Sequence, residues 1–221
     1  MRITQMQATD LGLDPKKYEV DEGCYSHIMP LLIDAGFVPW SPADIISQRN
    51  ASIGKIFQFP LWGNYFDTDS EIVGTQKEVY VLPRSPRLRT ITPQSKLVNG
   101  GLPLTLDDLP VRVKTYRRNE QIFDKLLTED EARRHPFWLD LAEGKQELLD
   151  TFVENTFSLG KDQHGRETMM GIQISEDSVG RPLKLYWLGY GARAARGSLD
   201  CNYFARLISV RDTGSTLESQ V

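Results

Sequence analysis

The chain has 221 residues, a formal net charge of −4 and two cysteines. This length allows one large domain or two small ones and a core that needs no cross-links. Two cysteines exclude a disulfide framework and a CxxC metal site, and the longest apolar run, residues 28–33, is far shorter than the roughly 20 residues of a membrane span. The acidic net charge argues against a general nucleic-acid binder.

Helix signals dominate the N-terminal part. Apolar residues at helical spacing, followed by Gly36, predict a helix over residues 25–35. Ser41 as N-cap, with Asp44 at the third helical position, predicts a second helix that ends near Arg49. From residue 54 to about 101, Gly, Pro, Asn and Asp interrupt short apolar pieces, so we expect an irregular region with one strand, Glu78–Leu82.

The second half begins with a capping box, Thr128 with Glu131, which predicts a short helix before Pro136. Apolar residues spaced three or four apart predict an amphipathic helix over residues 145–157 that Gly160 closes. No repeat or linker interrupts the chain, which favours one domain over residues 1–221.

Three strands follow in the predicted order: residues 168–174, 183–187 and 205–211. The last strand is expected to be central to its sheet, because Leu207, Ile208 and Val210 need burial. Residues 188–204 are too many for a tight hairpin, so they are predicted to form an excursion on the surface, where binding residues are often found.

The histidines and carboxylates of the chain do not form a recognisable metal or catalytic motif. His27, His135 and His164 lie far apart and in no HExxH spacing, so we interpret them as ordinary helix or loop residues. The carboxylate pairs Asp67 with Asp69 and Asp107 with Asp108 fit no calcium-binding loop and are interpreted as solvated turns. No nucleophile elbow, P-loop or dinucleotide fingerprint occurs.

The sequence does not show whether the two cysteines form a disulfide. A bridge between Cys24 and Cys201 requires Cα atoms within about 7 Å of each other, which spacing does not reveal. We take two free thiols as the default interpretation, with no metal and no cofactor.

Residues 188–211 have an unusual composition. They contain no Lys, Glu, Gln, Met or Trp, although the rest of the chain uses all five. An asparagine codon randomised at its two adenines cannot encode any of these five residues or a stop. Apolar anchors at Trp187, Leu199 and Leu207 enclose Tyr, Ser, Asp, Asn and Phe side chains that are typical of an evolved binding surface. The alternative is a Gly-rich hairpin that lacks the five residues by chance.

This segment resembles the variable region of diversity-generating retroelement variable proteins of the archaeal type, and the closing LISVR, Leu207–Arg211, is similar to the invariant strand that ends such regions. The resemblance covers about the last 30 residues. It implies an α+β fold: a C-type lectin-like domain, related to formylglycine-generating enzymes, with helices packed on twisted antiparallel strands and much irregular loop. It also implies adenine-directed mutagenesis of the gene region for residues 188–211.

The resemblance implies a ligand-binding protein that recognises variable protein or cell-surface macromolecules, at a virion or cell surface. The N-terminus has no apolar region like that of a signal peptide. The residues expected to be diversified or to face the ligand are Gly189, Tyr190, Gly191, Ala194, Arg196, Ser198, Asp200, Asn202, Tyr203 and Phe204. We further expect Tyr190, Tyr203 and Phe204 to form an exposed aromatic patch.

The chain departs from two relatives of that fold. The EPN, QPD and WND tripeptides of calcium-dependent lectins are absent, so we expect binding without calcium and doubt sugar recognition. Formylglycine-generating enzymes need a reactive cysteine pair, and Cys201 lies inside the segment suspected of variation. We therefore expect no enzymatic activity.

Two alternatives remain open. Residues 181–211 contain six basic residues and one acid, which favours a nucleic-acid-binding accessory protein. We nevertheless interpret Arg206 and Arg211 as framework residues and leave Arg196 open. A virion structural protein without variation would have the same composition. The tryptophans, Trp40, Trp62, Trp138 and Trp187, are expected to be core residues, and Trp187 to mark a fixed position beside the variable segment.

Overall fold

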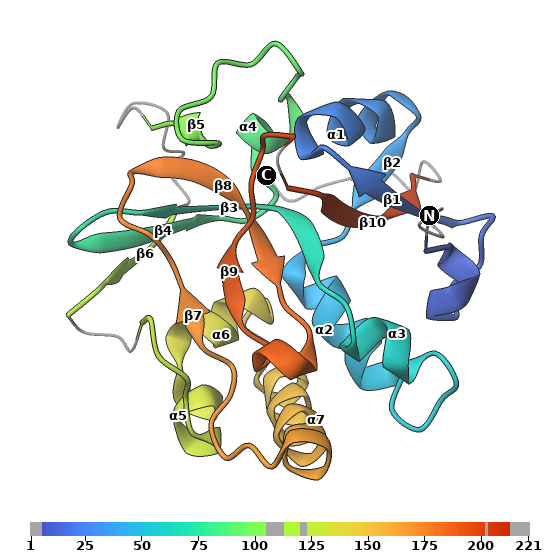
Figure 1. The fold of residues 1–221 in the computed structure, drawn as a ribbon, viewed down its shortest axis with the longest axis vertical. Helices are drawn as coiled ribbons and strands as arrows, with labels where there is room; N and C mark the ends of the chain where they lie inside the picture. The colour runs from blue at the N-terminus through green and yellow to red at the C-terminus, as the bar shows by residue number, and fades with distance from the viewer. Residues whose placement is uncertain (1–5, 105–112, 120–122, 202, 213–221) are drawn as a thin grey trace.

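The computed structural model of the chain describes residues 6–104, 113–119, 123–201 and 203–212. Its centre is formed by two sheets (Figure 1). The smaller sheet is antiparallel and has the order β1 (Tyr18–Gly23), β10 (Ala205–Arg211), β2 (Phe37–Pro39). The larger sheet has the order β6 (Lys114–Arg117), β4 (Glu78–Leu82), β3 (Phe66–Gly74), β8 (Val179–Leu185), β9 (Ala194–Arg196), β7 (Ile172–Gln173), with β5 (Leu102–Pro103) also paired to β8.

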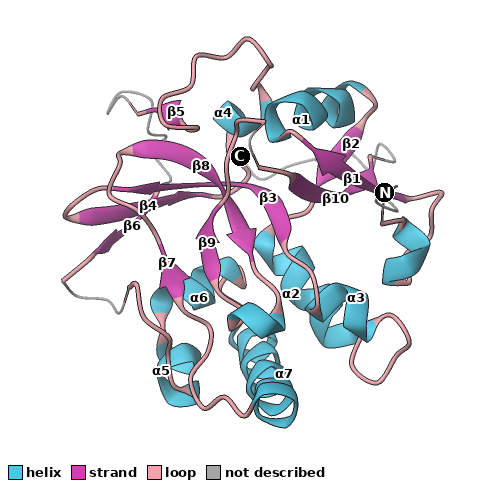
Figure 2. Cartoon of the chain, in the orientation of Figure 1, coloured by secondary structure: helices cyan, strands magenta, loops and turns pink. Residues whose placement is uncertain are grey.

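Helices flank both sheets. In Figure 2, α2 (Pro42–Ala51), α6 (Pro136–Leu141) and the long α7 (Gln146–His164) lie on one side of the larger sheet with α5 (Glu129–Arg134). The short helices α3 (Gln58–Trp62), α4 (Pro86–Arg89) and the 3₁₀ turns η1 (Ala8–Leu11) and η3 (Leu188–Tyr190) join the elements, and α1 (Tyr25–Asp34) covers the smaller sheet. The α+β class is therefore confirmed. Among the described residues, no helix combines the length and the apolar character that crossing a membrane requires.

Local capping signals predicted the helix starts correctly. The Ser41 hydroxyl accepts a hydrogen bond from the Asp44 amide, and the Asp44 carboxylate accepts one from the Ser41 amide, so α2 begins at Pro42. Thr128 and Glu131 form the same reciprocal pair at the start of α5. The predictions for α1 and β4 agree with the structure to within one residue at each end.

The end of α7 was predicted wrongly. Gly160 does not close the helix, which continues to His164 and ends at Gly165 in the left-handed conformation, with φ of 61°. Gly160 instead lies at a buried contact, where a Cβ would overlap the sulfur of Met169. The close approach between α7 and the following chain explains why a glycine occurs inside the helix.

The last strand has the predicted bounds and position. β10 pairs with β1 over six residues and with β2 over three, so it is the middle strand of the smaller sheet. Leu207 and Ile208 are buried, whereas Val210 is only partly buried. The two preceding strands are displaced from their predicted ranges, since β8 covers residues 179–185 and β7 only residues 172–173.

Strand β3 was missed because its sequence does not resemble a buried strand. All nine of its residues are buried, including Asp67, Asp69 and Glu71. The interpretation of Asp67 and Asp69 as solvated turns is therefore wrong. Carboxylates in mid-strand hide the apolar alternation on which strand prediction depends. The other pair, Asp107 with Asp108, lies outside the described residues.

The apolar core consists of two clusters. The larger one joins both sheets to the helices and contains Trp40, Trp62 and Trp138, as predicted. Trp187 is only partly buried, since it lies where the chain leaves β8. The smaller cluster lies under α1 and contains Leu199 and Leu207, two of the predicted anchors of the suspected variable segment.

Candidate functional site

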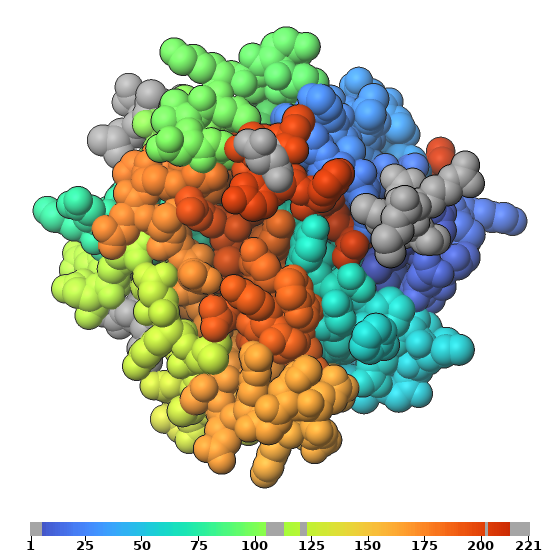
Figure 3. All heavy atoms as spheres, viewed as in Figure 1, coloured from blue at the N-terminus to red at the C-terminus, as the bar shows by residue number. Residues whose placement is uncertain are grey.

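The suspected variable segment, residues 188–211, begins after β8 and ends with β10, and its residues 188–204 cross one face of the molecule. In Figure 3 its orange-red atoms occupy the middle of the face in view. The segment is not entirely an excursion: residues 194–196 form β9, which pairs antiparallel with β8 and parallel with β7. Its middle is thus part of the larger sheet, and the parts on either side form the exposed surface.

Residues outside the segment hold its backbone in place. These hydrogen bonds are Met170 N to Gly191 O, 2.7 Å, Arg166 Nη2 to Gly189 O, 2.7 Å, Gly197 N to Pro182 O, 2.6 Å, Leu199 N to Gly100 O, 3.0 Å, Tyr65 Oη to Phe204 O, 3.0 Å, and Arg206 N to Asp67 Oδ2, 3.1 Å. None of these bonds uses a side chain of residues 188–204. These main-chain bonds therefore do not depend on which side chains occupy the exposed positions of the segment.

The buried side chain of Asp67 is one of the groups that hold the backbone of the segment. Its carboxylate accepts the Arg206 amide and lies 3.5 Å from Lys184 Nζ. Burial raises the pKa of Asp67 to about 6, although Lys184 and the Arg206 amide act in the opposite direction. Gly197 passes directly over this carboxylate, and a Cβ at that position would overlap Asp67 Oδ1 and lie 3.0 Å from Pro182 Cγ. Position 197 thus requires glycine.

A disulfide joins Cys24 to Cys201, so the default of two free thiols is wrong. Cys24 is the N-cap residue of α1, and Cys201 lies on the exposed part of the segment, with 4.6 Å between the two Cα atoms. The fold brings together residues 177 apart in sequence. No local pattern could have revealed the pair, because the contact depends on where α1 and the segment meet.

An aromatic platform, Tyr65, Tyr186, Trp187 and Tyr190, lies where the segment begins. Tyr186 and Tyr190 stack with 5.3 Å between ring centroids, and Trp187 lies 5.4 Å from Tyr190. Tyr65 packs beside Tyr186 at 6.3 Å. Burial raises the pKa of both Tyr65 and Tyr186, so both stay neutral phenols at physiological pH.

Cationic groups lie over these rings. Lys184 Nζ is 4.3 Å from the Tyr65 centroid, the Arg206 guanidinium is 5.1 Å from the same ring, and the Arg193 guanidinium is 5.0 Å from Tyr190. Cation–π contacts of this kind restrict both partners. The platform therefore offers rigid aromatic surface beside the segment.

Nine of the ten predicted site residues fall into three groups by burial. Tyr190, Arg196, Tyr203 and Phe204 are exposed, the last two at 66% and 68%. Gly189, Ser198 and Asp200 are partly buried, and the Ser198 hydroxyl donates to Asp200 Oδ1 at 3.1 Å. Gly191 and Ala194 are buried, and Asn202 lies outside the described residues.

Burial corrects the expectation for Gly191 and Ala194, since neither can face a ligand. Ala194 belongs to β9 between two neighbouring strands and is fully buried. Gly191 adopts φ of 80°, which favours glycine. Tyr190, Tyr203 and Phe204 are each exposed, as the predicted aromatic patch requires. Tyr65 contacts the Trp187 ring and donates a hydrogen bond to the Phe204 carbonyl.

The arginines of this region contact other protein groups. Arg206 pairs with Glu22 of β1 and donates to Asn64 Oδ1 at 2.6 Å, and the Arg211 guanidinium lies 4.8 Å from the Phe37 ring centroid. Both are framework residues, as predicted. Arg196, left open by the sequence, shares Asp177 with Arg181, each at 2.6 Å.

Asp177 is held ionised by these partners. Burial alone would raise its pKa, but the hydrogen bond and charge of Arg181, together with Arg196, lower it below its usual value. Much of the positive charge expected in this region is therefore compensated within the protein.

An apolar ridge beside the segment was not predicted. Ile56 and Phe59 are 98% and 77% exposed. They border a cavity of about 510 Å³ that is also lined by Trp62, His164, Trp187 and Gly189. The cyan atoms beside the orange-red segment in Figure 3 belong to this part of the chain. The only sequence signal is the placing of three large apolar residues, Ile56, Phe57 and Phe59, between Gly54 and Pro60.

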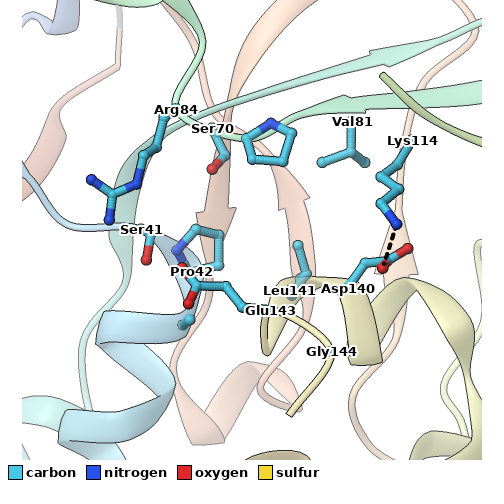
Figure 4. Close-up of a pocket in the computed structure, with 12 residues that line it drawn as sticks. Ser41, Pro42, Ser70, Val81, Arg84, Lys114, Asp140, Leu141, Glu143 and Gly144 are labelled. Atoms are coloured by element: carbon cyan, nitrogen blue, oxygen red, sulfur yellow. Dashed lines mark ion pairs between the residues drawn. The ribbon is translucent and has the colours of Figure 1, made fainter. Parts of the chain in front are cut away.

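A second cavity, of about 300 Å³, lies apart from the predicted residues (Figure 4). Ser41 and Pro42 at the start of α2, Ser70 of β3 and the Lys114–Asp140 ion pair, 3.2 Å, line it. None of the ten predicted residues is among its lining residues. It is therefore not part of the suspected binding face.

The sheets, the flanking helices and the long exposed segment before a central C-terminal strand define a C-type lectin-like domain. A solved structure from Nanoarchaeota, described as accommodating massive sequence variation by the C-type lectin fold, superposes with a TM-score of 0.62. The match is 18% identical and covers 88% of this chain and 97% of the other. At this identity it establishes the fold. No family model and no curated protein sequence matches the chain.

Proposed function

We propose that this chain is a ligand-binding protein whose residues 188–211 are diversified by retroelement-driven adenine mutagenesis to recognise variable macromolecular targets. The observation that carries the proposal is the way the segment is held. Main-chain groups and residues outside it, among them Gly100, Asp67 and Tyr65, make the hydrogen bonds that fix its backbone. Side chains at the exposed positions can then change while the backbone keeps one conformation, whereas Gly197, Leu199 and Cys201 are fixed by Asp67, the core and the bond to Cys24.

Binding follows from this division of roles. The fixed backbone lowers the entropic cost of association, because little has to be ordered when a target binds. The exposed side chains of Tyr190, Arg196, Tyr203 and Phe204 supply contact area and polar groups. The apolar ridge, Ile56 and Phe59, adds contact area that does not vary with the segment. In this proposal the chain acts by binding, without catalysis, calcium or a cofactor.

The DNA around the gene tests the diversification. We expect a near-copy of the codons for residues 188–211 that differs only at adenines, close to a reverse transcriptase gene. Sequencing the locus from several isolates should show substitutions concentrated at exposed positions. An invariant segment with no template copy would refute the diversification and favour a virion structural protein.

A binding assay tests the recognition. Tyr190→Ala combined with Tyr203→Ala should remove capture of protein or cell-surface material by the immobilised chain, and EDTA should leave wild-type capture unchanged. Tyr80→Ala, in β4 at another part of the larger sheet, is the matched control. Loss of capture with EDTA, or equal capture by the double variant, would contradict the proposal.

A nucleic-acid-binding role is the second candidate, because six basic residues lie between 181 and 211. Internal pairing weakens it: Arg181 and Arg196 contact Asp177, Arg206 contacts Glu22, and Lys184 contacts Asp67. Binding through phosphates would fall steeply with salt, roughly 10³-fold or more between 50 and 200 mM for six contacts. A weak salt dependence of target capture separates the two candidates.

A further inference from the structure

A histidine, which can bind metal, lies beside the Cys24–Cys201 disulfide. His27 belongs to the first turn of α1, and its Nε2 lies 3.8 Å from Cys201 Sγ. The ligand atoms of Cys24, His27 and Cys201 all lie within 4.8 Å of one another, and these are the three metal-ligating side chains that come together in the part of the chain the structure describes. His27 and Cys201 are exposed.

We propose that, when the disulfide is reduced, Cys24, His27 and Cys201 bind one Zn²⁺ that ties residue 201 to α1 in place of the covalent bond. This goes beyond the proposed function, since it concerns how the segment is held and not what it binds.

The spacing suits zinc. In a tetrahedral site with Zn–S of about 2.3 Å and Zn–N of about 2.0–2.1 Å, a sulfur and a nitrogen ligand lie about 3.6 Å apart. The separation of His27 Nε2 from Cys201 Sγ, 3.8 Å, is close to this value. Once the bond between them is broken, the two sulfurs need only move apart to a similar distance. Two thiolates and one imidazole form a donor set that zinc prefers.

The start of α1 places the Cys24 sulfur and the His27 imidazole where both can bind one metal ion. Cys24 and His27 are three residues apart at the start of a helix of ten residues, so their side chains lie on one face. The amide groups at a helix N-terminus stabilise a thiolate. The outward side of the cluster is open, because His27 and Cys201 are exposed, so water can complete a fourth position.

Reduction of the disulfide frees both sulfur ligands. A dithiol reductant supplies two electrons and two protons to the Cys24–Cys201 bond and closes to its own disulfide. The two thiols formed each release one proton when they bind Zn²⁺, so binding depends on pH. A small-molecule disulfide reverses the reaction: it takes two electrons from the two thiolates and two protons from water, becomes a dithiol, and the Cys24–Cys201 bond forms again as Zn²⁺ leaves.

Zinc titration tests the site. The chain is reduced with a phosphine, freed of reductant without oxygen, and titrated with Zn²⁺ against a chromophoric chelator. We expect one zinc per chain, a thiolate-to-metal absorption band when Co²⁺ replaces Zn²⁺, and no binding to the oxidised chain. His27→Ala should weaken binding at least about 100-fold, since even partners that only orient ligands are worth 10- to 100-fold. His164→Ala, at the exposed end of α7, is the matched control.

The zinc readout needs no target, so its failure is distinct from failure of the proposed function. No zinc binding by the reduced wild type, or binding by His27→Ala equal to wild type, would overturn the proposal. If reduction unfolds the chain, circular dichroism gives the answer: recovery of the folded spectrum on adding Zn²⁺ supports the site, and no recovery overturns it. The Cys24→Ser, Cys201→Ser double variant should bind no zinc in either case.

Discussion

Gly197 shows how a single position in the segment is restricted by the framework. It lies over the buried Asp67 carboxylate and beside Pro182, with no room for a Cβ. The neighbouring exposed residues have no such restriction. Adjacent residues of one segment therefore differ in the substitutions that they tolerate.

Gly197→Ala should lower the free energy of unfolding by about 1–3 kcal/mol, because Asp67 or the backbone must shift to accept the methyl group. Tyr203→Ser, at an exposed position, should change it by no more than about 0.5 kcal/mol. Urea denaturation of both variants measures the difference. Equal penalties would mean that the segment is not held over Asp67 as the structure has it.

Asp69 makes stability depend on pH. Burial, opposed by Arg84 and Arg89, raises its pKa from 3.8 to about 7. A carboxyl whose pKa is higher in the folded state keeps its proton longer there, so the free energy of unfolding falls as the pH rises from about 4 to about 7. Asp69→Asn, which is uncharged and similar in shape, should remove this part of the dependence.

Urea denaturation of wild type and Asp69→Asn at several pH values between 4 and 8 provides the measurement. The stability of the variant relative to wild type should increase with pH across this window. A difference that stays constant would show that Asp69 titrates normally in the folded protein.

At the scale of elements, β10 connects the proposed binding face to the core. It pairs with β1 on one side and β2 on the other, and Leu207 and Ile208 enter the core. Removing residues 205–221 should therefore abolish cooperative thermal unfolding. Arg211→Ala, at the exposed end of the strand, should melt near the wild-type temperature. A truncated chain that still melts cooperatively would contradict the central role of β10.

Elements with local signals could be predicted from the sequence, and those defined by distant contacts could not. Ser41 with Asp44 and Thr128 with Glu131 predict helix starts because capping involves residues three apart. β3 was missed because the partners that accommodate its carboxylates, Lys184 and Arg87 among them, are far away in sequence. The end of α7 was misplaced because Gly160 contacts Met169, a residue beyond the helix.

For the candidate site, too, the sequence predicted what depends on local composition and missed what depends on distant contacts. The codon-like composition indicated residues 188–211, and four of the ten chosen residues are exposed. The inward position of Ala194 depends on pairing with β7 and β8, and the bond between Cys24 and Cys201 depends on where α1 lies. These contacts join residues that are distant in sequence, so no local sequence pattern predicts them.

At the scale of the whole molecule, the proposed binding face would combine the suspected variable segment with the apolar ridge of Ile56 and Phe59. Ile56→Ser combined with Phe59→Ser should weaken binding about tenfold or more for every version of the segment, because we expect this pair to act as an interface hot spot, and loss of a hot-spot side chain costs about 2 kcal/mol or more. Leu31→Ser, at another exposed apolar position, in α1, is the control. Surface plasmon resonance with two segment versions and their targets measures the effect, and a loss confined to one version would contradict a shared ridge.

If residues 188–211 are diversified as proposed, the burial of β9 limits how many usable proteins the gene could encode. Buried positions such as Ala194 and Ala195 multiply the number of DNA sequences without adding usable surfaces, since most substitutions there would be lost as unfolded chains. Productive diversity therefore grows only with the exposed codons. A census of natural alleles should show small residues retained at 194, 195 and 197, and the number of distinct functional proteins should lie far below the number of possible gene sequences.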